Sequence, residues 1–266
     1  MLKTELKLPF VWYADINKQD RFRKQNLTKE PFALIAPHDR LLPFQIKRTK
    51  PVSPDTIIEW SIYNLSGVSV VDLLAYVATI EEKHTATEEY LTYKGDVLSI
   101  GLAKGCYYAR IIKGSDVYYS EVFRAETDLS SFTKLSWWNS CDISPVMYQT
   151  GFVNTIYLDT YTEVIPPDIN EEGVENGAGQ FIPTIQRIVH KHKIETFGPD
   201  YLLDALSFMS IHGSVQLTEG TDVTIIERVK VSPEFAENYG GTCKIEFELP
   251  GAYIRTNCCT NIALID

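Results

Sequence analysis

The segment Cys106–Phe123 constrains the fold of this chain more than any other. Two runs rich in aromatic and β-branched residues, 106–112 and 117–123, flank the polar Lys113-Gly114-Ser115-Asp116. Strand-forming runs on both sides of a short polar segment with a glycine are typical of a β-hairpin. The sequence therefore predicts a hairpin with a four-residue connection.

The alternation of residues within this hairpin predicts what its two faces contact. Successive side chains of a strand point to opposite faces, so Ala109 and Ile111 are expected to face a core together with Val122. The opposite face carries Cys106, Tyr108, Ile112, Val117, Tyr119 and Phe123 around Arg110. It is too apolar for a solvated sheet. We expect either another part of the chain or another chain to cover it.

Length and composition favour a mainly β chain of two domains. The chain has 266 residues, which is more than one hydrophobic core usually serves. Its 15 Tyr and 12 Phe against 3 Met favour strands, because aromatic side chains pack well on a pleated surface. Trp60 lies in the alternating segment 57–63, a pattern typical of a strand that anchors a sandwich core.

These patterns predict an order of domains along the chain. Residues 1–30 form an N-terminal arm, and residues 31–125 form a β-sandwich of immunoglobulin or fibronectin type III character. The polar segment 124–134 marks the boundary. Residues 126–266 form a second β-sandwich with one inserted helix at about 199–212.

Charge is distributed unevenly along the chain, whose formal net charge is -10. Residues 1–50 hold 11 Lys and Arg against 5 Asp and Glu, and the remainder holds 14 against 30. An acidic body argues against nucleic acid as a main partner, because backbone binding needs clustered cations. The basic N-terminal segment is either a solvated arm or a ligand for an acidic surface, such as the body of a neighbouring copy.

The five cysteines predict reduced thiols and folding in a reducing cytoplasm. Their number is odd, Cys258 and Cys259 are adjacent, and no CxxC pair exists, so neither a disulfide framework nor a zinc site is indicated. No secretory signal is recognisable, and no apolar segment approaches the roughly 20 residues that span a bilayer. We therefore expect no membrane partner.

Several residue groups resemble chemical sites and fail on closer inspection. His190 and His192 share one strand face but lack a third metal ligand. The acidic loop predicted at 168–180 imitates a calcium loop, yet its twelfth position is Gly179 instead of the required Glu. Trp137-Trp138 would place only one ring on a sugar-binding face. No nucleophile or phosphate-loop motif is present, so the sequence predicts no enzyme, no catalytic residue, no metal and no cofactor.

Several segments, taken together and in order, resemble those of one group of proteins. They are Leu42–Ile46, Cys106–Tyr108, Tyr118–Phe123, Tyr148–Phe152, Phe181–Arg187, Pro199–Leu206 and Asn257–Cys259. The set resembles proteins encoded in the tail modules of tailed bacteriophages of Bacteroidetes, including crAss-like phages. The resemblance runs from about Leu41 to the end of the chain, and no single motif in it is specific.

This resemblance implies a structural subunit of a virion, in the tail, the baseplate or a ring near the portal, assembled in the host cytoplasm. The expected partners are copies of itself and other virion proteins. Two further classes stay open: a glycan- or receptor-binding accessory module, and, less favoured, a hydrolase or depolymerase. For assembly we predict an interface that includes Tyr108, Tyr119 and Phe123 of the hairpin. Phe10 and Trp12 join it as part of an N-terminal strand lent to a neighbour.

Overall fold

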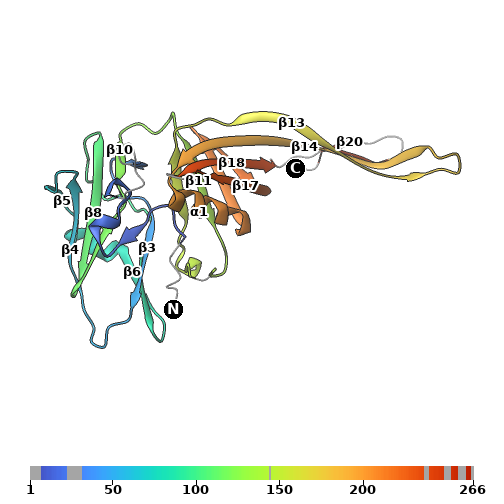
Figure 1. Cartoon of the computed structure of the whole chain (residues 1–266). Helices are drawn as coiled ribbons and strands as arrows, with labels where there is room; N and C mark the ends of the chain where they lie inside the picture. Colours follow the sequence, from blue (N-terminus) through green and yellow to red (C-terminus); the bar gives the residue numbers. More distant parts are fainter. Residues whose placement is uncertain are drawn as a thin grey trace.

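Strands dominate the structure, a computed structural model of the whole chain (Figure 1). It describes residues 7–22, 32–143, 145–236, 240–248, 253–256 and 262–264. For residues 170, 182–184, 187 and the last two stretches it describes the backbone alone. Within these ranges the chain is mainly β, with several sheets and one α-helix, as the sequence predicts.

The largest sheet has eleven strands and runs through both halves of the chain. From one edge its strands are β5 (Ser69–Asp72), β4 (Ile57–Asn64), β8 (Gly105–Lys113), β10 (Phe123–Glu126), β2 (Leu34–Pro37), β12 (Asn154–Leu158), β11 (Thr133–Trp138), β15 (Ser214–Glu219) and β16 (Asp222–Ile226). β8 pairs β10 through its first residues and β9 (Asp116–Ser120) through its last. β9 in turn pairs β1 (Trp12–Tyr13). We call this the large sheet.

The predicted hairpin is confirmed, with a tighter connection than expected. Lys113 pairs Asp116, so only two residues connect β8 and β9, and Gly114 takes a positive φ of 56° that a glycine adopts without strain. Ala109 and Ile111 are fully buried, as their alternation predicts. After β9 the register against β8 shifts by one residue, and β10 continues antiparallel to the first residues of β8, with Phe123 opposite Tyr107. Phe123 therefore shares the face of Tyr107 and not that of Tyr108.

A three-stranded sheet packs over the first half of the large sheet and completes a sandwich. Its strands, in spatial order, are β3 (Phe44–Thr49), β7 (Glu88–Tyr93) and β6 (Ile80–His84). Trp60 lies between the two sheets with no solvent exposure, and its ring meets those of Phe44 and Tyr93 edge-on at 6.5 and 5.6 Å. Trp60 is therefore a core anchor, as its place in β4 predicts.

In the second half, the large sheet faces a third sheet and the helix. That sheet, which we call the arm sheet, consists of β17 (Arg228–Phe235), β18 (Gly241–Glu248), β14 (Phe181–Gly198), β13 (Glu163–Glu175), β19 (Tyr253–Thr256) and β20 (Ile262–Leu264). Helix α1 (Asp200–Phe208) follows Pro199, continues as the 3-10 turn Met209–Ile211, and packs against β17 and β18. Leu202 and Leu206 are fully buried there, which confirms the predicted helix and its apolar stripe.

The two-domain division is not confirmed, because the predicted boundary between residues 125 and 126 falls inside β10. β10 pairs β8 on one side and runs parallel to β2 on the other. β2 in turn meets β12 of the second half, where Ile35 is opposite Tyr157. One hydrophobic core contains both Trp60 and Trp137. Backbone hydrogen bonding and core packing therefore connect the two halves.

We predict that Trp60→Ala destabilises the chain by about 3 to 5 kcal/mol, the usual cost of truncating a fully buried tryptophan. Because both halves share one core, fluorescence and far-UV circular dichroism should report the same urea transition. The matched control is Val52→Ala, whose side chain is fully exposed and should leave the midpoint unchanged. Two separate transitions would instead show that the halves fold independently.

Candidate interaction surfaces

A long hairpin projects from the second half of the molecule (Figure 1). β13 and β14 pair from Glu163–Lys193 outward to Glu175–Phe181, while β18 supports β14 only from Lys191 to Gly198. We call residues 168–189, beyond that support, the arm. Among the described strands it also pairs β19, at residues 185–188. A strand rises about 3.3 Å per residue, so the 13 residues of β13 span roughly 40 Å.

The sequence predicts an acidic loop at 168–180, but in the structure these residues belong to the arm. β13 runs through Pro166 and Pro167, because a register shift between Ile165 and Asp168 accommodates both prolines. Proline is tolerated here because β13 is an edge strand that pairs β14 alone. Asp168 lies beside Lys191 in an ion pair, so its carboxylate is not arranged in a calcium loop.

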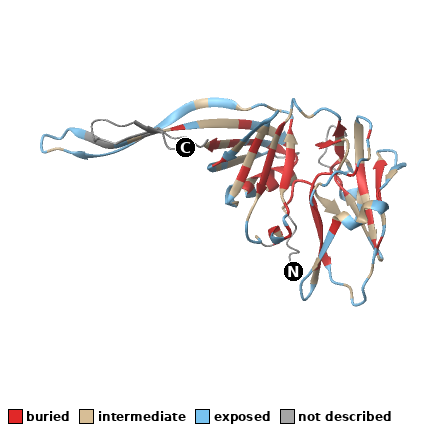
Figure 2. Ribbon diagram, turned by 180° about the vertical axis from the view of Figure 1, so that it is seen from behind, coloured by how far each residue is buried: buried red, intermediate tan, exposed pale blue. Residues whose placement is uncertain are grey.

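Apolar side chains of the arm are exposed to solvent. Ile169 is 63% exposed, Val174 60%, and Phe181 51%. The pale blue of the arm in Figure 2 contrasts with the red of buried residues in the body of the molecule. Exposed apolar side chains do not stabilise the fold of their own chain. The arm therefore presents apolar surface to solvent.

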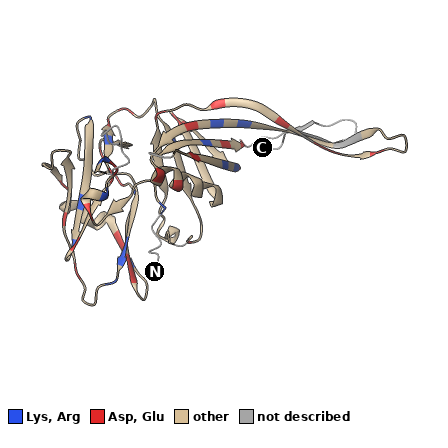
Figure 3. Ribbon diagram, in the orientation of Figure 1, with Lys and Arg blue, Asp and Glu red and all other residues tan. Residues whose placement is uncertain are grey.

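The charge of the arm changes along its length (Figure 3). Near the base of the arm, positive and negative side chains pair with each other. Lys193 binds Glu163 at 2.8 Å, and hydrogen bonds to Glu163 and Glu195 raise the pKa of Lys193. Farther out, residues 168–189 contain four Asp and Glu and one Arg. The outer part of the arm is consequently acidic as well as apolar.

A cationic pocket of about 100 Å³ lies where the two halves meet. Its lining includes the side chains of Arg40, Lys94, Lys134 and Tyr157 beside Leu41. Lys134 and Tyr157 are cross-strand partners on β11 and β12, so they lie on the same face of the large sheet. The sequence analysis missed this pocket, because its residues are far apart along the chain and form no motif.

The structure places three of the five predicted interface residues inside the chain's own fold. Phe10 and Phe123 are fully buried and meet edge-on at 6.0 Å, and Tyr108 is 5% exposed. Trp12 and Tyr119 are partly buried. Because β1 pairs β9, Trp12 lies opposite Ser120, and Tyr119 lies opposite Tyr13. The prediction that these side chains face a neighbouring copy is therefore wrong for Phe10, Phe123 and Tyr108.

Another part of the same chain covers the second face of the hairpin. The guanidinium of Arg21 lies 4.9 Å from the centre of the Tyr108 ring, and Tyr63 of β4 stacks on that ring at 5.4 Å. Arg110 binds Glu59 through two hydrogen bonds of 2.7 Å. Residues 7–22 of the predicted N-terminal arm thus fold onto their own chain. The rest of that arm, 1–6 and 23–30, lies outside the described residues.

A buried ionic cluster occupies one end of the sandwich. Lys113, which has no solvent exposure, forms ion pairs with Glu82 and with Glu89. Arg48 binds both Glu89 and Asp55. Burial lowers the pKa of Arg48, but the hydrogen bonds to these two carboxylates outweigh that effect and leave it raised. The cluster links β3, β6, β7 and β8.

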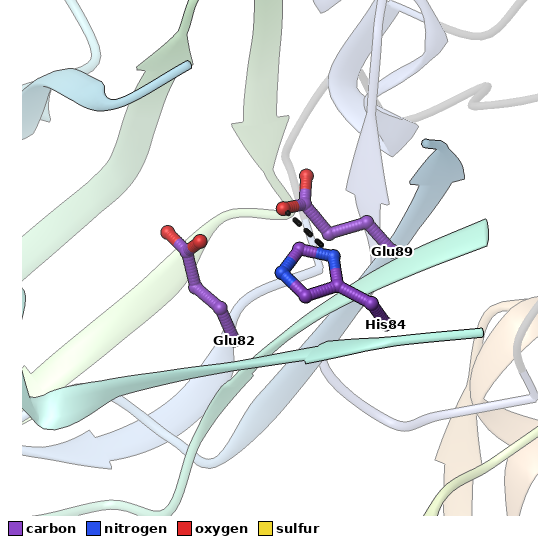
Figure 4. A group of neighbouring side chains, drawn as sticks. All are labelled: Glu82, His84 and Glu89. Atoms are coloured by element: carbon purple, nitrogen blue, oxygen red, sulfur yellow. Dashed lines mark ion pairs between the residues drawn. The ribbon is translucent and has the colours of Figure 1, made fainter. Parts of the chain in front are cut away.

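Part of this cluster has the spacing of a metal site (Figure 4). Glu82, His84 and Glu89 bring three ligand atoms within 4.8 Å of one another. Both oxygens of Glu89 are already engaged, one by Arg48 and the other by Lys113 at 3.2 Å. A metal ion would have to displace a fully buried lysine. The arrangement is better described as an ion-pair network.

A hydrogen-bond chain fixes the end of helix α1. Asn154 donates to the Tyr148 hydroxyl at 2.6 Å, which lies 2.6 Å from Nε2 of His212. Nδ1 of His212 lies 2.7 Å from the Phe208 carbonyl. In the neutral imidazole Nδ1–H donates to Phe208 and Nε2 accepts from Tyr148. Burial lowers the pKa of His212 below its usual 6.5, more than the hydrogen bond to Phe208 raises it.

Other sequence-level candidates are placed apart. His192 stacks on Phe247 with ring centres 5.9 Å apart, and His190 is exposed on the same strand. Trp137 is fully buried and Trp138 partly buried, so the two rings form no sugar-binding platform.

Comparison with protein-family models, with curated proteins and with solved structures finds no match to this chain. No helix among the described residues is both long enough and apolar enough to cross a bilayer.

We predict that Lys113→Met destabilises the chain by at least about 3 kcal/mol in urea unfolding, because it leaves buried carboxylates without their cation. Lys50→Met is the matched control, since Lys50 is exposed and outside the cluster. If Lys113→Met matches the wild type, the cluster contributes nothing to stability.

We predict that stability falls as the pH drops below 6.5, in part through His212. In this window the unfolded chain protonates its histidine while the folded chain does not, so acid favours unfolding. His212→Gln should reduce the loss of urea midpoint between about pH 7.5 and pH 5.5. His190→Gln, at an exposed site, should leave that loss unchanged. An unaltered slope in His212→Gln would contradict this account.

Proposed function

We propose that the chain is a structural, non-enzymatic subunit that assembles with copies of itself and with other virion proteins. The observation that carries the proposal is the arm, which extends beyond the supporting sheet and exposes Ile169, Val174 and Phe181. Apolar surface on an extended hairpin stabilises nothing in the isolated chain. Contact with a second molecule would remove it from water.

The resemblance to tail-module proteins of Bacteroidetes phages supports a place for this assembly in a virion tail, baseplate or ring near the portal. Assembly then takes place in the host cytoplasm. The first half fits an immunoglobulin-like module. Its strands β3, β7 and β6 lie over β4, β8 and β9, with Trp60 between the layers. The second half would be the module that carries the arm.

Shortening the arm tests this proposal. We would delete residues 171–186 and join Asn170 to Arg187 through Asn-Gly, because these two residues are paired in the hairpin register. The shortened chain is expected to keep the urea midpoint of the full chain, since the deleted part lies outside the core. In negative-stain images and analytical ultracentrifugation it should stay monomeric where the full chain forms closed rings or larger assemblies.

A point substitution provides a milder version of the same test. Val174→Asp places a charge on the exposed surface of the arm and should weaken assembly. Val52→Asp makes the same change at a fully exposed site in the first half and should have no effect. If the full chain is monomeric at every concentration, or if the shortened chain assembles equally well, the proposed function is wrong.

A further inference from the structure

The cationic pocket has one charge that no described residue of the chain neutralises. Arg40 is held by Asp39 through two hydrogen bonds of 2.9 and 3.0 Å, and Lys94 binds Glu81 at 2.9 Å. Lys134 is half-buried and has no ion-pair partner among the described residues. Three cations thus stand against two carboxylates around one small cavity.

The environment of Lys134 favours an incoming anion. Burial, and secondarily the charge of Arg40, lower the pKa of Lys134. A carboxylate placed beside this ammonium would relieve both effects, because an opposite charge nearby favours the charged form. The remaining lining includes Pro37, Leu41 and Leu42, so the occupant should combine a negative charge with apolar groups.

The outer end of the arm carries that combination. Glu175 is exposed and has no hydrogen-bond or ion-pair partner among the described residues. It is paired with Phe181, so its carboxylate and the exposed aromatic ring lie on the same face of the hairpin. The turn beyond them is held by Asn176, whose side-chain oxygen accepts hydrogen bonds from the backbone of Ala178 and Gln180 at 3.0 Å each.

We infer that the pocket around Lys134 receives the tip of the arm of a second copy, with the Glu175 carboxylate against the Lys134 ammonium. The arm projects away from the body that contains the pocket, so the contact joins two copies rather than two parts of one chain (Figure 3). The turn at the tip is already ordered, so little conformational entropy is lost on docking. This inference rests on the proposed function and names the contact that the assembly uses.

The contact also predicts the kind of assembly. Arm tip and pocket are different surfaces of the same chain, so the interaction is heterologous. A heterologous contact repeated from copy to copy produces a ring if the rotation closes and a filament if it does not. The charges in this contact are the reverse of those in the hypothesis drawn from the sequence. Here an acidic arm binds a basic pocket, whereas that hypothesis places a basic N-terminal arm on an acidic body.

Cross-linking of the full chain tests the contact directly. A water-soluble carbodiimide joins a lysine amine to a carboxylate without a spacer. It would be applied to assemblies formed from equal amounts of unlabelled and 15N-labelled protein. Mass spectrometry should find Lys134 joined to Glu175 in peptide pairs of mixed labelling, which only an inter-copy contact produces. Assemblies in which Lys134 is joined to no residue of the arm would overturn the inference.

Charge reversal provides the second measurement. Lys134→Glu and Glu175→Lys should each raise the concentration at half-assembly by about tenfold or more. Mixing the two variants should restore assembly in alternating order, because the pocket of each variant then meets an arm of opposite charge, and the double variant should restore assembly toward the wild-type level. Lys83→Glu is the control, because Lys83 is partly buried and outside the pocket.

Two outcomes separate this inference from the proposed function. If the wild-type chain assembles and both reversals assemble equally well, the function stands and the contact is wrong. If the wild-type chain never assembles, both fail. A chain whose Lys134 is protected from amine labelling by inorganic phosphate, with assembly unaffected, would show a small-anion site and would also overturn the inference.

Discussion

The pairing of the short strand β2 holds the whole structure together. Its four residues are all buried, and it runs between β10 of the first half and β12 of the second. Without this strand the large sheet would end at β10, and each half would expose an unpaired edge. Because β2 completes the hydrogen bonding on both sides, the pocket beside it and the arm beyond it keep a fixed relation. An assembly that uses both surfaces depends on that rigidity.

The charged side chains that stabilise the fold differ from the two to which we assign the contact between copies. At the end of the first sandwich, Lys113 and Arg48 are neutralised by buried carboxylates that connect four strands. At the base of the arm sheet, Lys193 pairs with Glu163 of the neighbouring strand, and Lys244 pairs with Glu246 of its own strand. Lys134 in its pocket and Glu175 at the arm tip have no ion-pair partner within the part of the chain that the structure describes. These two opposite charges are the physical basis for the contact that we propose.

Sequence patterns predicted local structure well where one periodicity dominated. The hairpin faces of Ala109 and Ile111, the core position of Trp60 and the helix after Pro199 follow directly from alternation, side-chain size and proline placement. Prediction failed where a tertiary partner changed the outcome. The acidic segment 168–180 is not a loop, because β13 continues through Pro166 and Pro167, and an edge strand tolerates their missing donors. Phe10 and Phe123 do not face a neighbour, because the N-terminal segment returns to cover the hairpin.

The sequence by itself determined the β character, the single helix and the apolar excess on one hairpin face, because those depend on residue type and spacing over a few positions. Only the tertiary structure decided what covers that face, that the halves share one sheet, and that Arg40, Lys94 and Lys134 converge. These features join residues tens of positions apart, and strand pairing over such distances leaves no periodic signal along the chain. The hairpin that constrained the fold is largely satisfied within it. The arm, in contrast, keeps its apolar side chains exposed.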